Sequence, residues 1–219
     1  MKYYFLACAT NKKETGVLGP QCMVFPTGYN LQWYDQPNSM TKITNDKFPD
    51  NNPEFIFELD PKAKLTDFIS QSIINARGFL ISEKVKSILE KFALPQHKFY
   101  SAKVFYNGKP IQYYWLHLLD NLYSEIDYTS SKFYHGLTQG WKTSDVIVNS
   151  LDDIVILRKQ MKLIYAESLV LQPILKIKDY DMLLFSLLHQ DIFISKQIAD
   201  YFTKEKITGY QVKEQEILN

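Results

Sequence analysis

Cysteine is scarce in this sequence, with Cys8 and Cys22 as the two thiols in 219 residues. They do not form a C-x-x-C pair, and two thiols are too few for the disulfide framework of a small secreted domain. We therefore expect both thiols to be reduced and buried. No apolar run approaches the roughly 18 residues that cross a membrane. The run before Cys8 is shorter than a signal peptide's apolar region, so we expect a first strand that ends at Asn11, a cytoplasmic protein and no membrane partner.

An excess of one charge is also absent, because 25 Lys and Arg balance 24 Asp and Glu. Without a basic block, nucleic acid is not an expected partner. The eight glycines form neither a G-x-G-x-x-G nor a P-loop pattern, and the four histidines lack metal-binding spacing. We expect no cofactor and no metal. His117, in the run YYWLHLLD, is expected to be a half-buried histidine with satisfied hydrogen bonds.

Apolar residues are plentiful, at 46% of the chain, and this content is typical of a globular protein with a core. FIFELD, Phe55 to Asp60, predicts a strand, and Leu65 to Ala76 has a loose helical spacing. Phe79 to Ile81 predicts a buried strand, after which Ser82 is placed to cap a helix. The apolar face of that helix repeats at i, i+3, i+4 and i+7: Val85, Ile88, Leu89 and Phe92. FYSAKVFY, NGKP and IQYYWLHLL then predict a β-hairpin.

The same pattern returns near the end of the sequence. Ile192 to Ile194 match the buried strand, Ser195 takes the capping position, and Gly209 ends the helix before a last strand. We therefore predict an α+β fold, with a mainly antiparallel sheet built from two related strand-helix-strand halves and helices covering one face. The halves are expected at about 55–110 and 147–219, within one domain that spans 1–219.

Two segments are expected to be mostly loop because turn-forming residues recur in them. The first, Lys12 to Glu54, is expected to contain one or two short strands, and the second runs from Thr129 to Ser144. Both contain large aromatic residues that could either pack beneath the loop or contact a partner. These residues are Trp33, Tyr34, Phe133, Tyr134 and Trp141.

No catalytic constellation follows from the spacing of reactive residues. Ser82 and Ser195 lie outside any G-x-S-x-G motif and have no neighbouring histidine, so capping is favoured over a nucleophilic role. Several carboxylates are close in sequence: Asp120 with Glu125 and Asp127, Asp152 with Asp153, and Asp179 with Asp181. Acid/base catalysis needs two carboxylates across a cleft. Because each pair adjoins a predicted turn or strand end, we expect structural roles and no enzymatic activity.

Three stretches of the chain resemble the bacterial immunity proteins encoded beside polymorphic toxins. They are FLISEKVK from Phe79, YYWLHLLDNLYSEID from Tyr113, and DMLLFSLLHQDIFISKQIADYFTKEKITGYQV from Asp181 to Val212. The resemblance covers about the C-terminal two-thirds of the chain, and its most specific part ends in the I-T-G-Y turn, Ile207 to Tyr210. It implies a non-enzymatic inhibitor that binds a cognate protein toxin and protects the producing cell and its kin during interbacterial competition.

The family pattern consists of core and turn positions, so it assigns no binding residues. From their positions in turn-rich segments we predict Trp33, Tyr34 and Trp141 as anchors on the toxin. Asp35, Asp46 and Asp50 are predicted to steer a basic partner. Two alternatives remain open: a carbohydrate-binding or scaffolding module that stacks sugars on the same aromatics, and a small hydrolase that uses one of the carboxylate pairs.

Overall fold

The computed structural model describes residues 3–23, 36, 39–160, 163–171 and 180–213. The chain is α+β, with mixed and antiparallel sheets, and it divides into two compact units. Unit 1 contains the described residues of Met1–Leu6, Asp120–Ala199 and Val212–Asn219, and unit 2 contains those of Ala7–Leu119 and Asp200–Gln211. These bounds differ from those of the two predicted halves, and the single-domain prediction stays a prediction. Within the described residues, no helix has the length and apolar character needed to span a bilayer.

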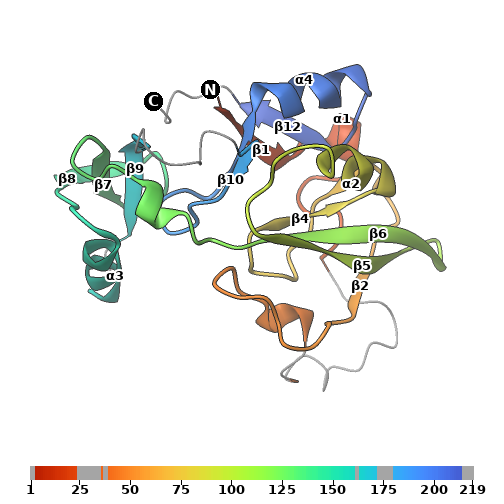
Figure 1. Ribbon diagram of the computed structural model, residues 1–219. Helices are drawn as coiled ribbons and strands as arrows, with labels where there is room; N and C mark the ends of the chain where they lie inside the picture. Colours follow the sequence, from red (N-terminus) through yellow and green to blue (C-terminus); the bar gives the residue numbers. More distant parts are fainter. Residues whose placement is uncertain (1–2, 24–35, 37–38, 161–162, 172–179, 214–219) are drawn as a thin grey trace. The chain divides into compact units, whose positions relative to one another are not determined.

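A five-stranded sheet forms the centre of unit 2 (Figure 1), in the order β2-β5-β6-β4-β3. The strands are β2 (Phe55–Glu58), β3 (Phe68–Ile69), β4 (Gly78–Ile81), β5 (His97–Tyr106) and β6 (Lys109–Leu118). The predicted hairpin of β5 and β6 is confirmed, because the two strands pair antiparallel. Its turn has positive φ at Asn107 and Gly108, as a type I′ turn requires. The parallel pairing of β2 with β5 makes the sheet mixed.

Helix α2 (Glu83–Leu89) begins where the sequence predicts, and its apolar face is buried at Val85, Ile88 and Leu89. It packs against β4 and β6. The main core of unit 2 includes Phe55, Phe57, Leu80, Val104 and Trp115. The buried strand and three residues of the predicted face are therefore confirmed, whereas Phe92 lies beyond the end of α2 and is half-buried.

The segment Lys12 to Glu54 contains less regular structure than expected in its described part. It has a one-turn helix α1 (Lys12–Thr15), a 3₁₀ helix η2 (Met40–Lys42) and an isolated bridge at Cys22, without a strand in those residues. Cys22, Met40 and Ile43 nevertheless belong to the core of unit 2. Both thiols are free, and burial raises the pKa of each to about 12. Cys22 is a core cysteine, as predicted, whereas Cys8 is only half-buried by solvent exposure and belongs to neither core cluster.

The helix predicted at Leu65–Ala76 is wrong. This stretch contains the short strand β3, which pairs with β4, and irregular backbone that side chains hold in place. The Gln21 side chain donates to the carbonyl of Lys64 and accepts from the backbone N–H of Ser70. Gln71 Oε1 accepts from two further backbone N–H groups. These bonds take the place of helical ones, because a buried backbone group needs a partner from some source.

Most strand residues of unit 1 belong to two sheets. The strands of the first lie in the order β10-β11-β1-β12: β1 (Tyr3–Cys8), β10 (Met182–Leu183), β11 (Ile192–Ser195) and β12 (Tyr210–Lys213). The last two residues of β1 and the first two of β12 fall within the bounds of unit 2. The second has the order β8-β7-β9: β7 (Lys132–Gly136), β8 (Lys142–Val146) and β9 (Ile164–Ser168). The helical elements of unit 1 are η3 (Tyr123–Glu125), α3 (Leu151–Lys159) and the first residues of α4 (Lys196–Lys204).

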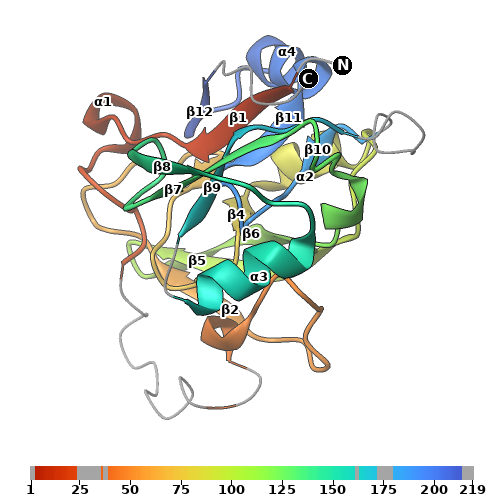
Figure 2. The same cartoon turned by 90° about the vertical axis from the view of Figure 1, so that its left-hand side faces the viewer.

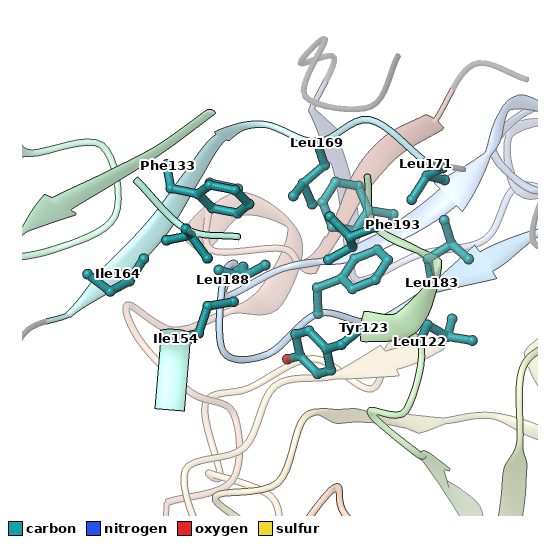
Figure 3. Close-up of a cluster of buried hydrophobic side chains, with 14 of the residues drawn as sticks. Leu122, Tyr123, Phe133, Ile154, Ile164, Leu169, Leu171, Leu183, Leu188 and Phe193 are labelled. Atoms are coloured by element: carbon teal, nitrogen blue, oxygen red, sulfur yellow. The ribbon is translucent and has the colours of Figure 1, made fainter. Parts of the chain in front are cut away.

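Apolar side chains from these elements form one buried cluster (Figure 3). It includes Phe133 from β7, Ile154 from α3, Ile164 from β9 and Phe193 from β11. The predicted loop from Thr129 to Ser144 is therefore wrong, because half of it forms β7 and the beginning of β8. Phe133 and Tyr134 are correspondingly buried, so of the two predicted alternatives they follow the one of packing within the fold. Their partner strand β9 is distant in sequence, so local composition did not indicate the pairing.

Both predicted serine caps are confirmed, and each serine hydroxyl also donates a hydrogen bond to an aspartate. Ser82 Oγ accepts from the N–H of Val85 at 3.3 Å and donates to Asp67 Oδ1 at 2.8 Å. Ser195 Oγ accepts from the N–H of Ile198 at 3.3 Å and donates to Asp181 Oδ1 at 2.7 Å. These bonds explain the serines by helix capping, without a nucleophilic role.

Replacing either serine with alanine is expected to lower the free energy of unfolding by about 0.5 to 2 kcal/mol, because a helix N–H loses its acceptor. The Ser195→Ala variant should lie near the upper end, since Ser195 is fully buried and Ser82 is partly exposed. Urea unfolding measures both values. Equal stability of the two variants and the parent would contradict the capping role.

Candidate functional site

Trp141, the predicted anchor that lies within the described residues, is in the turn between β7 and β8 of unit 1, and Figure 2 shows this hairpin. Trp141 is 65% exposed and Leu137, at the start of the same turn, is 66% exposed. The turn is bonded to itself and to β7: the N–H of Trp141 donates to the carbonyl of Thr138 at 3.0 Å, and the N–H of Gly140 donates to the Tyr134 hydroxyl at 2.6 Å. The hairpin therefore holds Trp141 on a structured turn and leaves its side chain accessible.

A second feature of this surface is an open pocket of about 690 Å³ at the other end of β8. Its apolar part is formed by residues that include Tyr128, Phe133 and Val146, and by Ile147, which is 85% exposed. Its charged part is formed by Lys132, Lys142, Asp145 and Glu167. Such a combination of apolar walls with a few polar groups is typical of a binding surface.

Lys142 links the charged groups of this pocket. Its Nζ lies 2.5 Å from Asp145 Oδ1 and 3.2 Å from Glu167 Oε2. Hydrogen bonds to these two carboxylates raise the pKa of Lys142, so its ammonium stays charged at neutral pH. Exposed ion pairs of this kind add little stability. They orient the lysine across the hairpin, from β8 toward β9. We refer to Leu137, Trp141, Ile147 and this pocket together as the hairpin surface.

Two of the predicted steering residues belong to unit 2. Asp46 and Asp50 are exposed in the loop Ile43–Asn51 of unit 2, and Trp33, Tyr34 and Asp35 lie outside the described residues. Asp46 accepts a hydrogen bond from the Thr44 hydroxyl, which lowers the pKa of the Asp46 carboxyl.

Asp50 lines a pocket of about 140 Å³ whose other charged residues are Lys42 and Lys47. The charges of this pocket are therefore mixed, so the field available to steer a basic partner is weaker than that of the aspartates alone.

Sequence reasoning missed Leu137 and Ile147. Their signal was weak: Leu137 is a single apolar residue in the turn sequence GLTQGW, and Ile147 directly follows a strand whose residues are exposed or half-buried. Exposure of an isolated apolar side chain is common on protein surfaces. What distinguishes these two is their position on one hairpin with Trp141 and the pocket, which only the strand pairing shows.

Asp120, one of the carboxylates considered as catalytic groups, has structural partners. Asp120 Oδ2 accepts from the Tyr123 hydroxyl at 2.7 Å and from the N–H and hydroxyl of Ser186. Burial raises the pKa of Asp120, although these hydrogen bonds oppose the shift. Tyr123 in turn accepts from the N–H of Leu187. The cluster thus ties the chain after β6 to the 185–187 segment, and Asp120 lines neither of the two pockets.

Comparison of the chain with models of protein families found no match, and neither did a search among curated proteins. The residues described also contain no group of three or more His, Cys, Asp or Glu side chains arranged to hold a metal ion. The hairpin surface presents one indole, two exposed aliphatic side chains, and a lysine held between two carboxylates.

Proposed function

We propose that this protein is an immunity protein, which binds a cognate bacterial toxin and neutralises it in the cytoplasm of the producing cell. The observation that carries the proposal is the hairpin surface, where Trp141 and Leu137 are exposed on a turn with its own hydrogen bonds. Tryptophan is among the residues most enriched at the energetic centres of protein interfaces. The resemblance of three stretches to immunity proteins supports the same function, with no enzymatic activity, no cofactor and no nucleic-acid partner.

An inhibitor of this kind must capture toxin molecules before they act, which calls for nanomolar affinity, or about −12 kcal/mol. An interface of standard size buries about 1,600 Å² in total and reaches such affinity when a few large side chains fill pockets of the partner. A preordered turn reduces the conformational entropy lost on binding. Trp141 therefore suits the role of an anchor better than an aromatic residue on an unsupported loop.

The Trp141→Ala variant is expected to bind the toxin encoded by the neighbouring gene with an affinity reduced by about 2 kcal/mol or more, which is roughly a 30-fold increase in Kd. Calorimetry with purified toxin gives the value, and co-expression in a sensitive host shows whether protection falls with it. Ile156→Ala is the matched control, because Ile156 is 52% exposed on α3 of the same unit but lies outside the hairpin surface.

Two outcomes would count against the proposal at different levels. If the parent protein neither binds the toxin nor protects the host, the immunity function is wrong. If the parent protects and Trp141→Ala binds equally well in a folded state, the function stands but the hairpin surface is not the interface. Binding of oligosaccharides by the parent, lost in Trp141→Ala, would favour the carbohydrate-binding alternative instead.

We also propose that the fold contains two related strand-helix-strand halves. The support is local and specific. In both places an aspartate precedes a two-residue strand, and that strand pairs antiparallel with a strand leading to the capping serine: Phe68 opposite Ile81, and Met182 opposite Ile194. The N–H of Ser82 donates to the carbonyl of Asp67, as that of Ser195 does to Asp181. Duplication of an ancestral unit would produce this agreement without any catalytic role for the serines.

A further inference from the structure

The loop Ile43–Asn51 of unit 2 is fastened to neighbouring strands at two adjacent points. Asn45 Nδ2 donates to the carbonyls of Arg77 and Leu118, at 2.7 and 2.9 Å, and Asn45 Oδ1 accepts from the N–H of Arg77 at 2.7 Å. Beside it, Nε2 of His117 on β6 lies 2.7 Å from the carbonyl oxygen of Thr44. One amide side chain and one imidazole thus supply the hydrogen bonds that fasten the loop to these strands.

The contact with Thr44 determines which nitrogen of His117 carries the proton. A carbonyl oxygen only accepts, so Nε2 must be the N–H donor and Nδ1 the bare nitrogen of the neutral ring. Nδ1 is buried and has no hydrogen-bond partner among the described residues, and the whole side chain is 0% exposed. The ring meets Phe48 edge-on, with centroids 5.3 Å apart, so an apolar loop residue covers it.

Protonation of this ring would add an N–H at Nδ1, where no acceptor among the described residues faces it, and a positive charge in an apolar site. Burial is the main cause that lowers the pKa of His117, and the ammonium of Lys98 on β5 lowers it further. That ammonium lies over the Phe48 ring, 4.6 Å from its centroid. The hydrogen bond to the Thr44 carbonyl and the carboxylate of Asp46 favour the charged form, but they do not outweigh burial. Tyr100, the other ionisable group whose ring faces His117, is neutral at these pH values.

We propose that His117 is an acid-sensitive latch: the neutral imidazole holds the loop Ile43–Asn51 against β6, and protonation at Nδ1 releases it. In the released loop, water reaches Nδ1 and the imidazole regains its ordinary pKa of about 6.5. The closed state binds fewer protons than the open state. The equilibrium constant for closing therefore falls as the pH drops below about 6.5, by up to about tenfold per pH unit, until the pKa of the closed state is reached. The latch operates whether or not the chain binds a toxin.

Hydrogen exchange of the loop at pH 7.5 and pH 5.5, corrected for the intrinsic effect of pH, tests the latch. We expect loop peptides of the parent to exchange up to about tenfold faster at pH 5.5, while peptides from α2 and the β5–β6 hairpin remain unchanged. In His117→Gln, the amide can still donate to Thr44 but does not titrate, so loop exchange should be the same at both pH values. His97→Gln is the matched control on β5 and should keep the acid response of the parent.

Equal loop exchange of the parent at both pH values would overturn the latch, and so would an acid response retained in His117→Gln. If His117→Gln does not fold, nitrogen NMR of the parent decides. The latch requires the Nε2–H form at pH 7.5 and protonation of His117 over the same pH range as loop opening. A protonated His117 beneath a loop that still exchanges slowly would contradict it. Asn45→Ala, which removes the other fastening, should exchange quickly at both pH values and shows the signal of an open loop.

Discussion

Replacing Gly209 with alanine is expected to destabilise the protein by about 3 kcal/mol or more. Gly209 belongs to the I-T-G-Y turn and has φ of +80°, a left-handed conformation that costs other residues about 1 to 2 kcal/mol. A Cβ added there would overlap the carbonyl oxygen of Phe68 and lie 2.6 Å from Thr66 Oγ1. Overpacking adds about 1 to 3 kcal/mol, and because one of these contacts is backbone, a rotamer change does not relieve it.

The hydrogen bonds around this turn show why it has no freedom to move away. The N–H of Gly209 donates to Glu14 Oε1 at 2.6 Å, and its carbonyl accepts from the N–H of Ala9 at 2.8 Å. The preceding residue, Thr208, donates from its N–H and its hydroxyl to Asp67 Oδ2. A shift large enough to admit a methyl group would break several of these bonds at once. The motif therefore anchors the segment Asp200–Gln211 within unit 2.

Gly108→Ala is the matched control for this prediction. Gly108 lies in the same unit with φ of +72°, but a Cβ added there has no heavy atom within 4 Å. It should show only the conformational cost of about 1 to 2 kcal/mol. The difference between the two variants in urea unfolding isolates the steric part. A Gly209→Ala variant no less stable than Gly108→Ala would show that the turn tolerates the displacement.

Truncation of Phe202 to alanine is the other change with a large expected effect, a loss of about 3 to 5 kcal/mol. Phe202, on α4, is 0% exposed within unit 2. Its ring centroid lies 5.5 Å from that of Phe68 on β3 and 5.3 Å from that of Tyr210 on β12. Removing the ring takes away burial energy and leaves a cavity between a helix and two strands, and rigid neighbours of this kind collapse only in part.

Tyr201→Ala provides the comparison, because Tyr201 precedes Phe202 in the same helix but is only partly buried. Its ring lies edge-on to that of Phe92, with centroids 5.7 Å apart. Both substitutions change helix propensity equally, so their difference reports burial. Thermal unfolding should show a clearly lower melting temperature for Phe202→Ala than for Tyr201→Ala. If the two variants melt together, the placement of this face of α4 is wrong.

Elements with a strong local signal could be predicted from the sequence. Helix α2 combines a capping serine with apolar residues spaced by three and four. The residues Asn107 and Gly108 favour the positive φ angles that the turn of the β5–β6 hairpin requires. Such patterns act over a few residues: a hydroxyl caps the next helical turn, and a glycine accepts positive φ. The capping serines were explained correctly for the same reason, although their aspartate partners, Asp67 and Asp181, were not recognised.

Elements whose backbone partners are distant in sequence could not be predicted. The stretch Leu65–Ala76 has helical spacing, yet Gln21 and the pairing of β3 with β4 satisfy its backbone groups. Likewise the sequence predicts a loop where β7 forms. Strand β9, which pairs with one edge of β7 beside Phe133 and Tyr134, follows some thirty residues later in the sequence. Strand formation depends on such neighbours more than on intrinsic preference.

The sequence by itself determined the class of the protein: an α+β chain with an apolar core, two reduced thiols and two serine-capped helices, because composition, caps and periodicity act locally. Only the tertiary structure decided which aromatic residues are accessible. Tyr134 and Trp141 have similar surroundings in the sequence, but pairing of β7 with strands on both sides buries the first, whereas the turn at the end of the hairpin leaves the second exposed. Exposure is a property of contacts between distant segments, so it follows from the fold and not from residue type.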